Sequence, residues 1–401
     1  MVDHLGVYLH IPFCQSKCHY CDFVSGVFPD HLINPYIEAL KEEIQRIERA
    51  LRAIQIDPKL ITSSRVDSLY FGGGTPSYIK ARHILELTRV LHSAFDFSAE
   101  VEVTLEVNPG SVDAEKIPQY QEAGVNRISI GIQAFQDHLL KRTGRSHSVE
   151  EGNATIELFR QAGFRNISVD VIAGLPGQSL GDWQETLKMG RLLSPEHISM
   201  YLLELHENTV FGRFYSKTRP TTDSTLDTLT FPNLPSEELV EQFYMEAVQK
   251  LTSAGYLHYE ISNFAKPGHE SRHNLKYWTD QPFLGFGCSA SSYLDRRRWS
   301  NERNPWKYIE RIKHDHQAVD CLYQLNDQER QEEAIFLGLR LIRGLDIREF
   351  NARFGFDFYE RFSNPIAHLQ SGGLVECSAD WVRLTPSGCL LSNEVITEFL
   401  V

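Results

Sequence analysis

The sequence predicts an α/β fold in which six parallel strand–helix units precede a small, mainly helical, winged-helix-like C-terminal domain. Short apolar strands alternate with helical segments six times before residue 205. This alternation is typical of βαβ units in a parallel sheet, and six units suit an incomplete (β/α)6 barrel. Glycine-containing turns follow two of the strands, at the carboxyl ends where such folds place functional groups. After about residue 325 the pattern changes to short helices.

The predicted elements follow one another along the chain. Strands are expected over residues 6–11, 66–71, 101–107, 126–133, 166–172 and 197–203. Between the first two strands, Asn34 and Pro35 predict a helix N-terminus, and apolar residues at helical spacing continue this helix to Ile54. The other helices are expected over residues 79–95, from a Ser148–Glu151 capping box to about Gly163, and over residues 180–192.

The second half of the chain is less regular. A polar, turn-forming stretch over residues 217–225 predicts a surface loop. A helix and one further strand near the open edge of the sheet should follow, and the C-terminal domain should end in a hairpin. These elements are expected over residues 236–254, 256–264, 332–342, 346–354, 359–370 and 374–384. We therefore divide the chain into a core barrel over 1–235, a barrel-completing segment over 236–324 and a C-terminal domain over 325–401.

The composition is that of an ordinary globular protein. The 401 residues are 42% hydrophobic and 23% charged, which suits about two domains. The net charge of −13 argues against a nucleic-acid partner, so we favour a lid or docking role for the C-terminal domain. Seven cysteines, mostly unpaired by spacing, suggest a reducing compartment. The first apolar run is too short for a signal peptide, and no run reaches the ~20 residues of a transmembrane helix. We expect a cytoplasmic protein and leave peripheral membrane contact open.

Three cysteines, Cys14, Cys18 and Cys21, follow the first strand in the spacing CxxxCxxC. Thiolates select iron–sulfur clusters, zinc or copper(I). A cubane cluster is usually held by four cysteines, so three would leave one iron open to a small molecule. The alternative is a structural zinc site, which usually adds a second pair of Cys or His ligands. We favour the cluster, because the other cysteines are scattered singly at Cys288, Cys321, Cys377 and Cys389.

This motif resembles the signature of the radical S-adenosylmethionine (SAM) superfamily. The resemblance implies an incomplete parallel barrel and a 4Fe-4S cluster on Cys14, Cys18 and Cys21. It also implies that SAM binds the open iron through its amino and carboxylate groups and is cleaved by one electron from the cluster. The residues that follow the motif test this interpretation.

Further residues resemble, in order and spacing, the SAM-binding positions of oxygen-independent coproporphyrinogen III oxidases and their relatives. By this resemblance, Tyr8 and Tyr20 pack against SAM and the cluster, and Gly74 and Thr75 hold the amino-acid end of SAM. Glu106 ends a strand and fits a SAM-contacting acid, although its residue type alone also suits a salt-bridged surface acid. The resemblance assigns the remainder of SAM, including the ribose and carboxylate, to Gln133, Arg145 and Asp170.

Two features separate this chain from the oxidase branch of that family. Oxidases extend the motif to a fourth cysteine, where this chain has Phe23, and their N-terminus is longer. Residues 273–278, HNLKYW, match the HNxxYW motif of the other branch, the HemW family of heme chaperones. This resemblance implies haem binding and haem transfer to acceptor haemoproteins, which we expect to be respiratory enzymes at the membrane. The cluster and SAM would then act as a conformational or assembly switch, and a homodimer is one state that the sequence allows.

Within this motif, His273 is the predicted haem ligand because neutral imidazole is the commonest axial ligand of haem iron. Tyr277 and Trp278 would offer flat apolar area to a porphyrin. The alternative is that His273 caps a turn and Trp278 fills core. We interpret Cys288 as a core thiol rather than a reserve ligand. The alternative function is SAM-dependent oxidative decarboxylation of coproporphyrinogen III, so whether the chain is an enzyme stays open and no catalytic residue is assigned.

Overall fold

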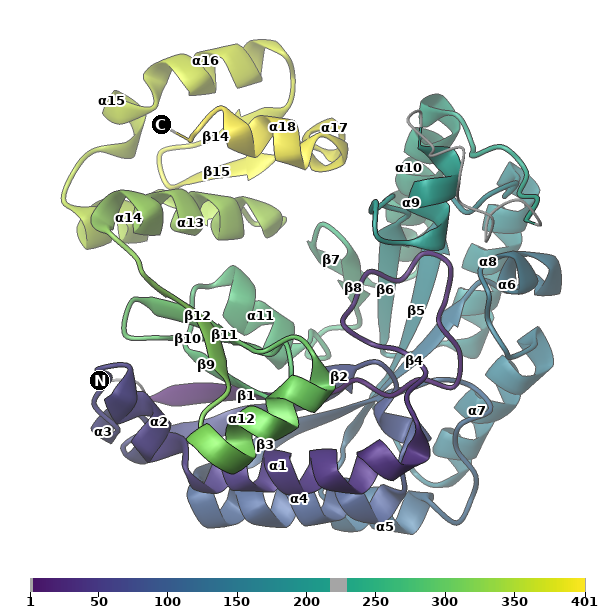
Figure 1. The fold of residues 1–401 in the computed structure, drawn as a ribbon. Coiled ribbons are helices and arrows are strands. Elements are labelled where there is room, and N and C mark those ends of the chain that lie inside the picture. The colour runs from purple at the N-terminus through teal and green to yellow at the C-terminus, as the bar shows by residue number, and fades with distance from the viewer. Residues whose placement is uncertain (1–2, 217–228, 401) are drawn as a thin grey trace.

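A computed structural model describes residues 3–216 and 229–400 of the chain. Its main sheet has twelve strands in the order β12-β11-β10-β9-β1-β2-β3-β4-β5-β6-β8-β7. The surface loop predicted over residues 217–225 lies outside the described residues. The sheet curves into an open arc, with helices along its outer face and the C-terminal domain beyond one end (Figure 1).

The middle six strands pair in parallel and confirm the predicted core. They are β1 (His4–Ile11), β2 (Arg65–Gly73), β3 (Asp96–Val107), β4 (Arg127–Gln133), β5 (Ile167–Ala173) and β6 (His197–Leu202). Their apolar side chains, such as Leu9, Phe71 and Ile130, are fully buried in one continuous core. Strands that are covered on both faces consist of such apolar runs, and these runs are why the six strands could be predicted from the sequence.

Both ends of the arc are extended by shorter strands. Beyond β1 lie β9 (Phe283–Phe286), which is parallel to β1, and the antiparallel strands β10 (Ser291–Leu294), β11 (Arg297–Asn301) and β12 (Val319–Gln324). Beyond β6 lies an antiparallel hairpin of β7 (Leu257–Glu260) and β8 (Asn263–Ala265). The prediction of a single strand over residues 256–264 was wrong, because the buried Glu260 carboxylate accepts hydrogen bonds from Ser262 and Asn263 and closes a turn there.

The helix after β1 also differs from its prediction. A short turn, η1 (Asp30–Leu32), leads into α1 (Ile33–Gln45), so Asn34 and Pro35 lie inside the first turn and Asn34 is not the N-cap. Proline is tolerated there because the first-turn N–H groups have no helical partner. The backbone leaves helical geometry at Arg46 (φ −105°, ψ 9°), and α2 (Ile47–Ala53) follows as a separate helix.

The remaining helices and short turns around the arc are α3 (Lys59–Thr62), η2 (Pro76–Tyr78), α4 (Ala81–Ala94), α5 (Ile117–Glu122), α6 (Asp137–Arg142), α7 (Val149–Gln161), α8 (Leu180–Leu193), α9 (Val210–Tyr215), α10 (Glu237–Ser253), α11 (Arg272–Trp278) and α12 (Pro305–Asp315). The helices predicted over residues 79–95, 148–163, 180–192 and 236–254 are present as α4, α7, α8 and α10, whereas α3, α5, α6, α9, α11 and α12 were not predicted. The capping boxes at Ser148 and Ser179 are formed by side-chain bonds to the third helical residue. No helix in the described ranges is long and apolar enough to cross a membrane.

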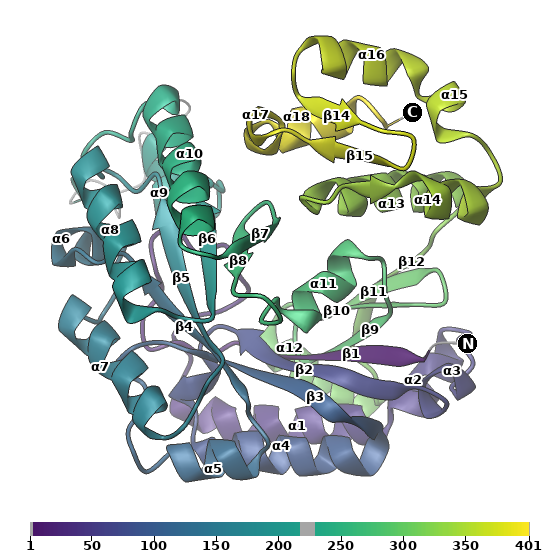
Figure 2. The same ribbon diagram turned by 180° about the vertical axis from the view of Figure 1, so that it is seen from behind.

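The C-terminal region packs short helices around a small sheet of order β13-β15-β14 (Figure 2). The predicted hairpin is present, whereas the helix expected over residues 359–370 is divided at Phe362. The elements are α13 (Asp327–Arg340), β13 (Leu345–Asp346), α14 (Ile347–Phe354), α15 (Phe358–Arg361), α16 (Ser363–Ser371), β14 (Val375–Cys377), β15 (Trp381–Leu384), α17 (Pro386–Leu390) and α18 (Ser392–Thr397). The domain boundaries after residues 235 and 324 stay a prediction.

Candidate functional site: a thiol-lined cavity at the carboxyl ends of the strands

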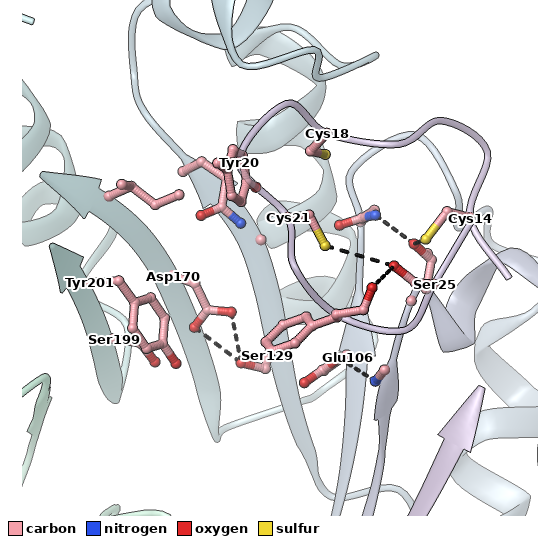
Figure 3. Close-up of a pocket in the computed structure, with 18 of the residues that line it drawn as sticks. Cys14, Cys18, Tyr20, Cys21, Ser25, Glu106, Ser129, Asp170, Ser199 and Tyr201 are labelled. Atoms are coloured by element: carbon pink, nitrogen blue, oxygen red, sulfur yellow. Dashed lines mark hydrogen bonds between the residues drawn. The ribbon is translucent and has the colours of Figure 1, made fainter. Parts of the chain in front are cut away.

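The carboxyl ends of the parallel strands surround a cavity of about 460 Å³. This first cavity is covered by the loop between β1 and α1, residues 12–29, which we call the cluster loop. Figure 3 shows Cys14, Cys18 and Cys21 on this loop, with Glu106 and Asp170 on the strands below. All predicted site residues except Tyr8 and His273 line the first cavity, namely Cys14, Cys18, Cys21, Tyr20, Gly74, Thr75, Glu106, Gln133, Arg145 and Asp170.

Backbone hydrogen bonds hold the cluster loop over the strand ends. Cys14 N donates to Gly26 O at 2.9 Å, and Gly26 N donates to Pro12 O at 2.9 Å, so the two ends of the loop are joined. Its far side is attached through His19 N, which donates to Thr143 O at 2.9 Å. The loop is therefore fixed at both sides although the residues 12–29 form no long helix or strand.

Each of the three cysteine sulfurs accepts a hydrogen bond from a neighbouring side chain, and Cys21 Sγ also lies 3.7 Å from the Ser25 hydroxyl, its second hydrogen-bond partner. The donors are Thr75 Oγ1 to Cys14 at 3.7 Å, Arg145 Nη1 to Cys18 at 3.6 Å and Lys17 Nζ to Cys21 at 3.5 Å. Hydrogen bonds of this kind stabilise negative charge on the sulfurs of iron–sulfur centres. Burial raises the pKa of the Cys14 thiol, so its thiolate form needs a positive partner such as iron.

The three motif thiols line the same cavity. Within the described ranges, no group of three or more His, Cys, Asp or Glu side chains that could hold one metal ion is present. In a 4Fe-4S cluster, each thiolate would bind a separate iron.

The turn after β2 brings the backbone against the cluster loop. Gly74 N donates to Ile11 O and Thr75 N donates to Phe13 O, both at 2.8 Å. A Cβ atom on Gly74 would lie 2.8 Å from Cys14 Sγ, so only glycine fits this contact. The Thr75 hydroxyl, which donates to Cys14, itself accepts a hydrogen bond from Asn108 at 2.7 Å.

Two carboxylates face the floor of the first cavity. Tyr70 donates to Glu106 Oε1 at 2.8 Å and Gly73 N donates to Oε2 at 3.2 Å, yet burial raises the pKa of Glu106 to about 7. Burial also raises the pKa of Asp170, which accepts a hydrogen bond from Ser129 at 3.2 Å. Such buried acids can accept hydrogen bonds from ligand hydroxyl or ammonium groups.

Two more predicted residues, Gln133 and Arg145, meet beside β4. Gln133 has a left-handed backbone conformation (φ 68°), which turns the chain at the end of the strand. Arg145 donates to Gly131 O as well as to Cys18, so its guanidinium joins the strand end to the cluster loop. Its Nε has no hydrogen-bond partner in the described structure, which leaves a donor for a ligand.

Several residues that line the first cavity were not predicted from the sequence. They are polar residues within apolar strands or at strand ends, and they include Tyr70, Asn108, Arg127, Ser129, Ser199 and Tyr201. Ser129 and Tyr70 alternate with apolar neighbours on the face that carries the predicted residues, and this alternation was an available signal. Arg127 is the most unusual member, since it is only 2% exposed and its Nε has no hydrogen-bond partner among the described residues.

Tyr8 and His273 lie outside the first cavity. Tyr8 lines a second cavity together with Glu106 and Gly73. His273 is 1% exposed and both ring nitrogens are engaged, Nδ1 with Ser68 Oγ at 3.0 Å and Nε2 with Tyr277 Oη at 2.8 Å. Both ring nitrogens therefore hold protein partners in this structure, and the assignment of His273 as a haem ligand stays a prediction. Cys288 is fully buried beside Tyr36, as expected of a core thiol.

Comparisons with known proteins agree with this fold and identify its family. Residues 8–190 match the radical SAM superfamily model, and residues 325–391 match the HemN C-terminal domain model. The chain is 35% identical to the heme chaperone HemW of Bacillus subtilis (strain 168), over 98% of this chain and 99% of that relative. It is 33% identical to the heme chaperone HemW of Escherichia coli (strain K12), over 99% and 98% respectively.

A solved structure extends the comparison to the fold. The coproporphyrinogen III oxidase HemN from Escherichia coli, a radical SAM enzyme, superposes with a TM-score of 0.82. The match covers 100% of this chain and 91% of that chain at 24% identity. Because relatives of 33% and 35% identity are matched over nearly their whole length, the chain belongs to the HemW family of heme chaperones, within the radical SAM superfamily.

Proposed function

We propose that this chain is a haem chaperone that holds a 4Fe-4S cluster and SAM in its first cavity, binds haem and passes it to acceptor haemoproteins. The observation that carries the proposal is the full-length similarity to relatives named heme chaperones, in a chain whose three motif cysteines line one cavity. The acceptors we infer are respiratory enzymes at the membrane, reached from the cytoplasm.

The residues of the first cavity suit the two cofactors. Cys14, Cys18 and Cys21 would each bind one iron, and the cluster would supply an open iron and one reducing electron. The Gly73–Thr75 turn and Glu106 would hold the amino-acid end of SAM. Arg145 would bind the carboxylate of SAM, since a guanidinium matches a carboxylate in geometry and charge. Asp170 would accept hydrogen bonds from the ribose hydroxyl groups.

The cofactor assignment is tested by Cys18→Ala in protein reconstituted anaerobically with iron and sulfide. We expect this variant to lose the cluster, with iron and sulfide per chain falling to background. Cys321→Ala is the matched control, because Cys321 is also partly exposed but lies on β12. Full iron and sulfide in Cys18→Ala would overturn the assignment.

The function is tested by offering the reconstituted chain both haemin and coproporphyrinogen III. We expect haemin to bind and then to appear in the absorbance spectrum of an added apo-haemoprotein, faster than haemin transfers alone. No protoporphyrinogen IX should form in the presence of SAM, reductant and an electron acceptor. Formation of protoporphyrinogen IX without haemin transfer would identify an oxidase instead.

A further inference from the structure

A second cavity of about 380 Å³ also lies against the cluster loop, which contributes Asp22, Phe23 and Val24 to its lining. The two cavities share Asp22, Phe23, Gly73 and Glu106 in their linings, so they are neighbours. The far wall of the second cavity comes from the extension of the sheet beyond β1, through Phe283, Ser289, Ser291 and Arg303. A cleft of this size suits a small organic ligand.

Flat apolar groups form much of the lining. The rings of Tyr277 and Phe283 pack edge to face, with centroids 4.6 Å apart, and the ring of Tyr8 lies beside them. Phe23 on the cluster loop is 65% exposed. An exposed aromatic ring at the mouth of an aromatic cleft favours a planar, apolar ligand that would cover it.

The HNxxYW motif contributes its tyrosine to this cavity, and its histidine lies behind the tyrosine. His273 is held between Ser68 on β2 and the Tyr277 hydroxyl, and its ring faces that of Tyr70 at 5.2 Å. Burial lowers the pKa of His273 to about 3, so the ring is neutral and donates through one nitrogen while it accepts through the other. His273 therefore fixes the orientation of the Tyr277 ring.

A positive charge without a partner completes the cavity. The side chain of Arg303 forms no hydrogen bond or ion pair with any residue of the described ranges, although it lines the cleft. A guanidinium is always charged near neutral pH and binds carboxylates through two parallel hydrogen bonds. The carboxyl groups of Asp22 and Glu106 line the side that the two cavities share, whereas Arg303 belongs to the far wall. The far wall thus combines flat apolar groups with one carboxylate-binding group, which matches a porphyrin whose propionate points away from those two acids.

We propose that the second cavity binds the porphyrin cargo, with the macrocycle against Phe23 and Tyr277 and a propionate on Arg303, and that His273 positions Tyr277 and does not ligate iron. This inference rests on the proposed function and assigns its cargo site. It places the cargo next to the cofactor cavity, with Phe23 between the two. The Phe23 ring stands where the oxidase branch has its fourth motif cysteine.

The first test measures the affinity of the reconstituted chain for haemin and for metal-free protoporphyrin IX, by absorbance and by quenching of tryptophan fluorescence. Arg303→Glu should weaken both porphyrins by about tenfold or more, the factor expected for one charge-assisted hydrogen bond. Arg82→Glu is the matched control, since Arg82 is also exposed and forms no ion pair with the part of the chain that the structure describes, but lies on α4. The dimethyl ester of protoporphyrin should bind the unaltered chain more weakly and should not respond to Arg303→Glu.

The second test addresses the aromatic wall. Phe23→Ser should weaken both porphyrins, whereas Tyr323→Ser, which changes a ring of similar exposure (63%) on β12, should not. His273→Ala should lower the affinities for haemin and for metal-free protoporphyrin by the same factor, because the substitution removes a hydrogen bond to Tyr277 and no ligand of the iron. Circular dichroism and iron and sulfide contents show whether each variant keeps its fold and its cluster. If His273→Ala unfolds, the substitutions at the exposed residues Phe23 and Arg303 still test the cavity.

The outcomes separate this inference from the proposed function. No haemin binding by the unaltered chain would remove the haem chaperone function itself. Haemin binding that Arg303→Glu and Phe23→Ser leave at the level of their controls would refute the second cavity and leave the function standing. Loss of haemin binding in His273→Ala with unchanged metal-free protoporphyrin binding would make His273 an iron ligand and overturn its positioning role.

Discussion

The contact between Gly74 and the cluster loop gives the sharpest prediction for the first cavity. In Gly74→Ala the added Cβ would lie 2.8 Å from Cys14 Sγ, 2.8 Å from the carbonyl carbon of Pro12 and 2.9 Å from Phe13 O. Two of these three atoms belong to backbone, which cannot rotate away as a side chain can. The φ angle of Gly74 is not in the left-handed region, so the effect of the substitution is purely steric.

The loss of stability expected for Gly74→Ala follows from the contacts that the added Cβ would disturb. Separating the turn from the cluster loop strains two hydrogen bonds, Gly74 N to Ile11 O and Thr75 N to Phe13 O. Overpacking of a tight contact costs about 1–3 kcal/mol, and each weakened hydrogen bond adds about 0.5–1.5 kcal/mol. We therefore expect the free energy of unfolding to fall by about 2–6 kcal/mol and Cys14 to move out of position for a cluster.

The assay is denaturant unfolding of the cluster-free chain, together with iron and sulfide content after anaerobic reconstitution. Gly181→Ala is the matched control, because a Cβ there would meet only Ser179 Oγ at 3.7 Å, an ordinary contact. If Gly74→Ala matched Gly181→Ala in stability and kept a full cluster, the close approach of the turn to the loop would be refuted.

Three further predictions concern other parts of the structure. Asp280→Ala removes a carboxylate that is 6% exposed and that pairs with Arg353, so the free energy of unfolding should fall by about 1.5–3 kcal/mol. The pKa of Glu106 rises from 4.5 to about 7 on folding, so the folded chain binds more protons in this window. Its stability should therefore fall relative to Glu106→Gln as the pH rises from about 4.5 to about 7. Arg145→Met removes the donor to Gly131 and to the cluster loop, and calorimetry should show SAM affinity at least about tenfold lower.

Each of these predictions has its own control. Asp327→Ala removes a carboxylate that is 73% exposed from its pair with Arg296, so a loss as large as that of Asp280→Ala would contradict the burial argument. Parallel stability curves for Glu106→Gln and the unaltered chain between pH 4.5 and 7 would mean that the carboxyl is not desolvated. Unchanged SAM affinity in Arg145→Met would remove this residue from the cofactor site.

Local signals predicted the parts of the structure that short segments determine. The six parallel strands are apolar because both their faces are buried, and the cysteine spacing identifies the cluster loop. The strands beyond β1 were missed because they are short and carry charge, as in β11 with Arg297 and Arg298, whose ladder depends on pairing with distant β12. The orientation of His273 was missed for the same reason, since its partner Ser68 lies 205 residues away.

The two cavities are lined largely by different segments of the chain, which has a consequence for how their linings can evolve in this family. Across the fully described range 283–324, no residue lines the first cavity, whereas four line the second. Substitutions in this extension can alter which cargo is accepted without touching any group that holds the cofactors. Within the described residues, Asp22, Phe23, Gly73 and Glu106 line both cavities, so substitutions at these positions are the changes that would alter cargo preference and cofactor chemistry together.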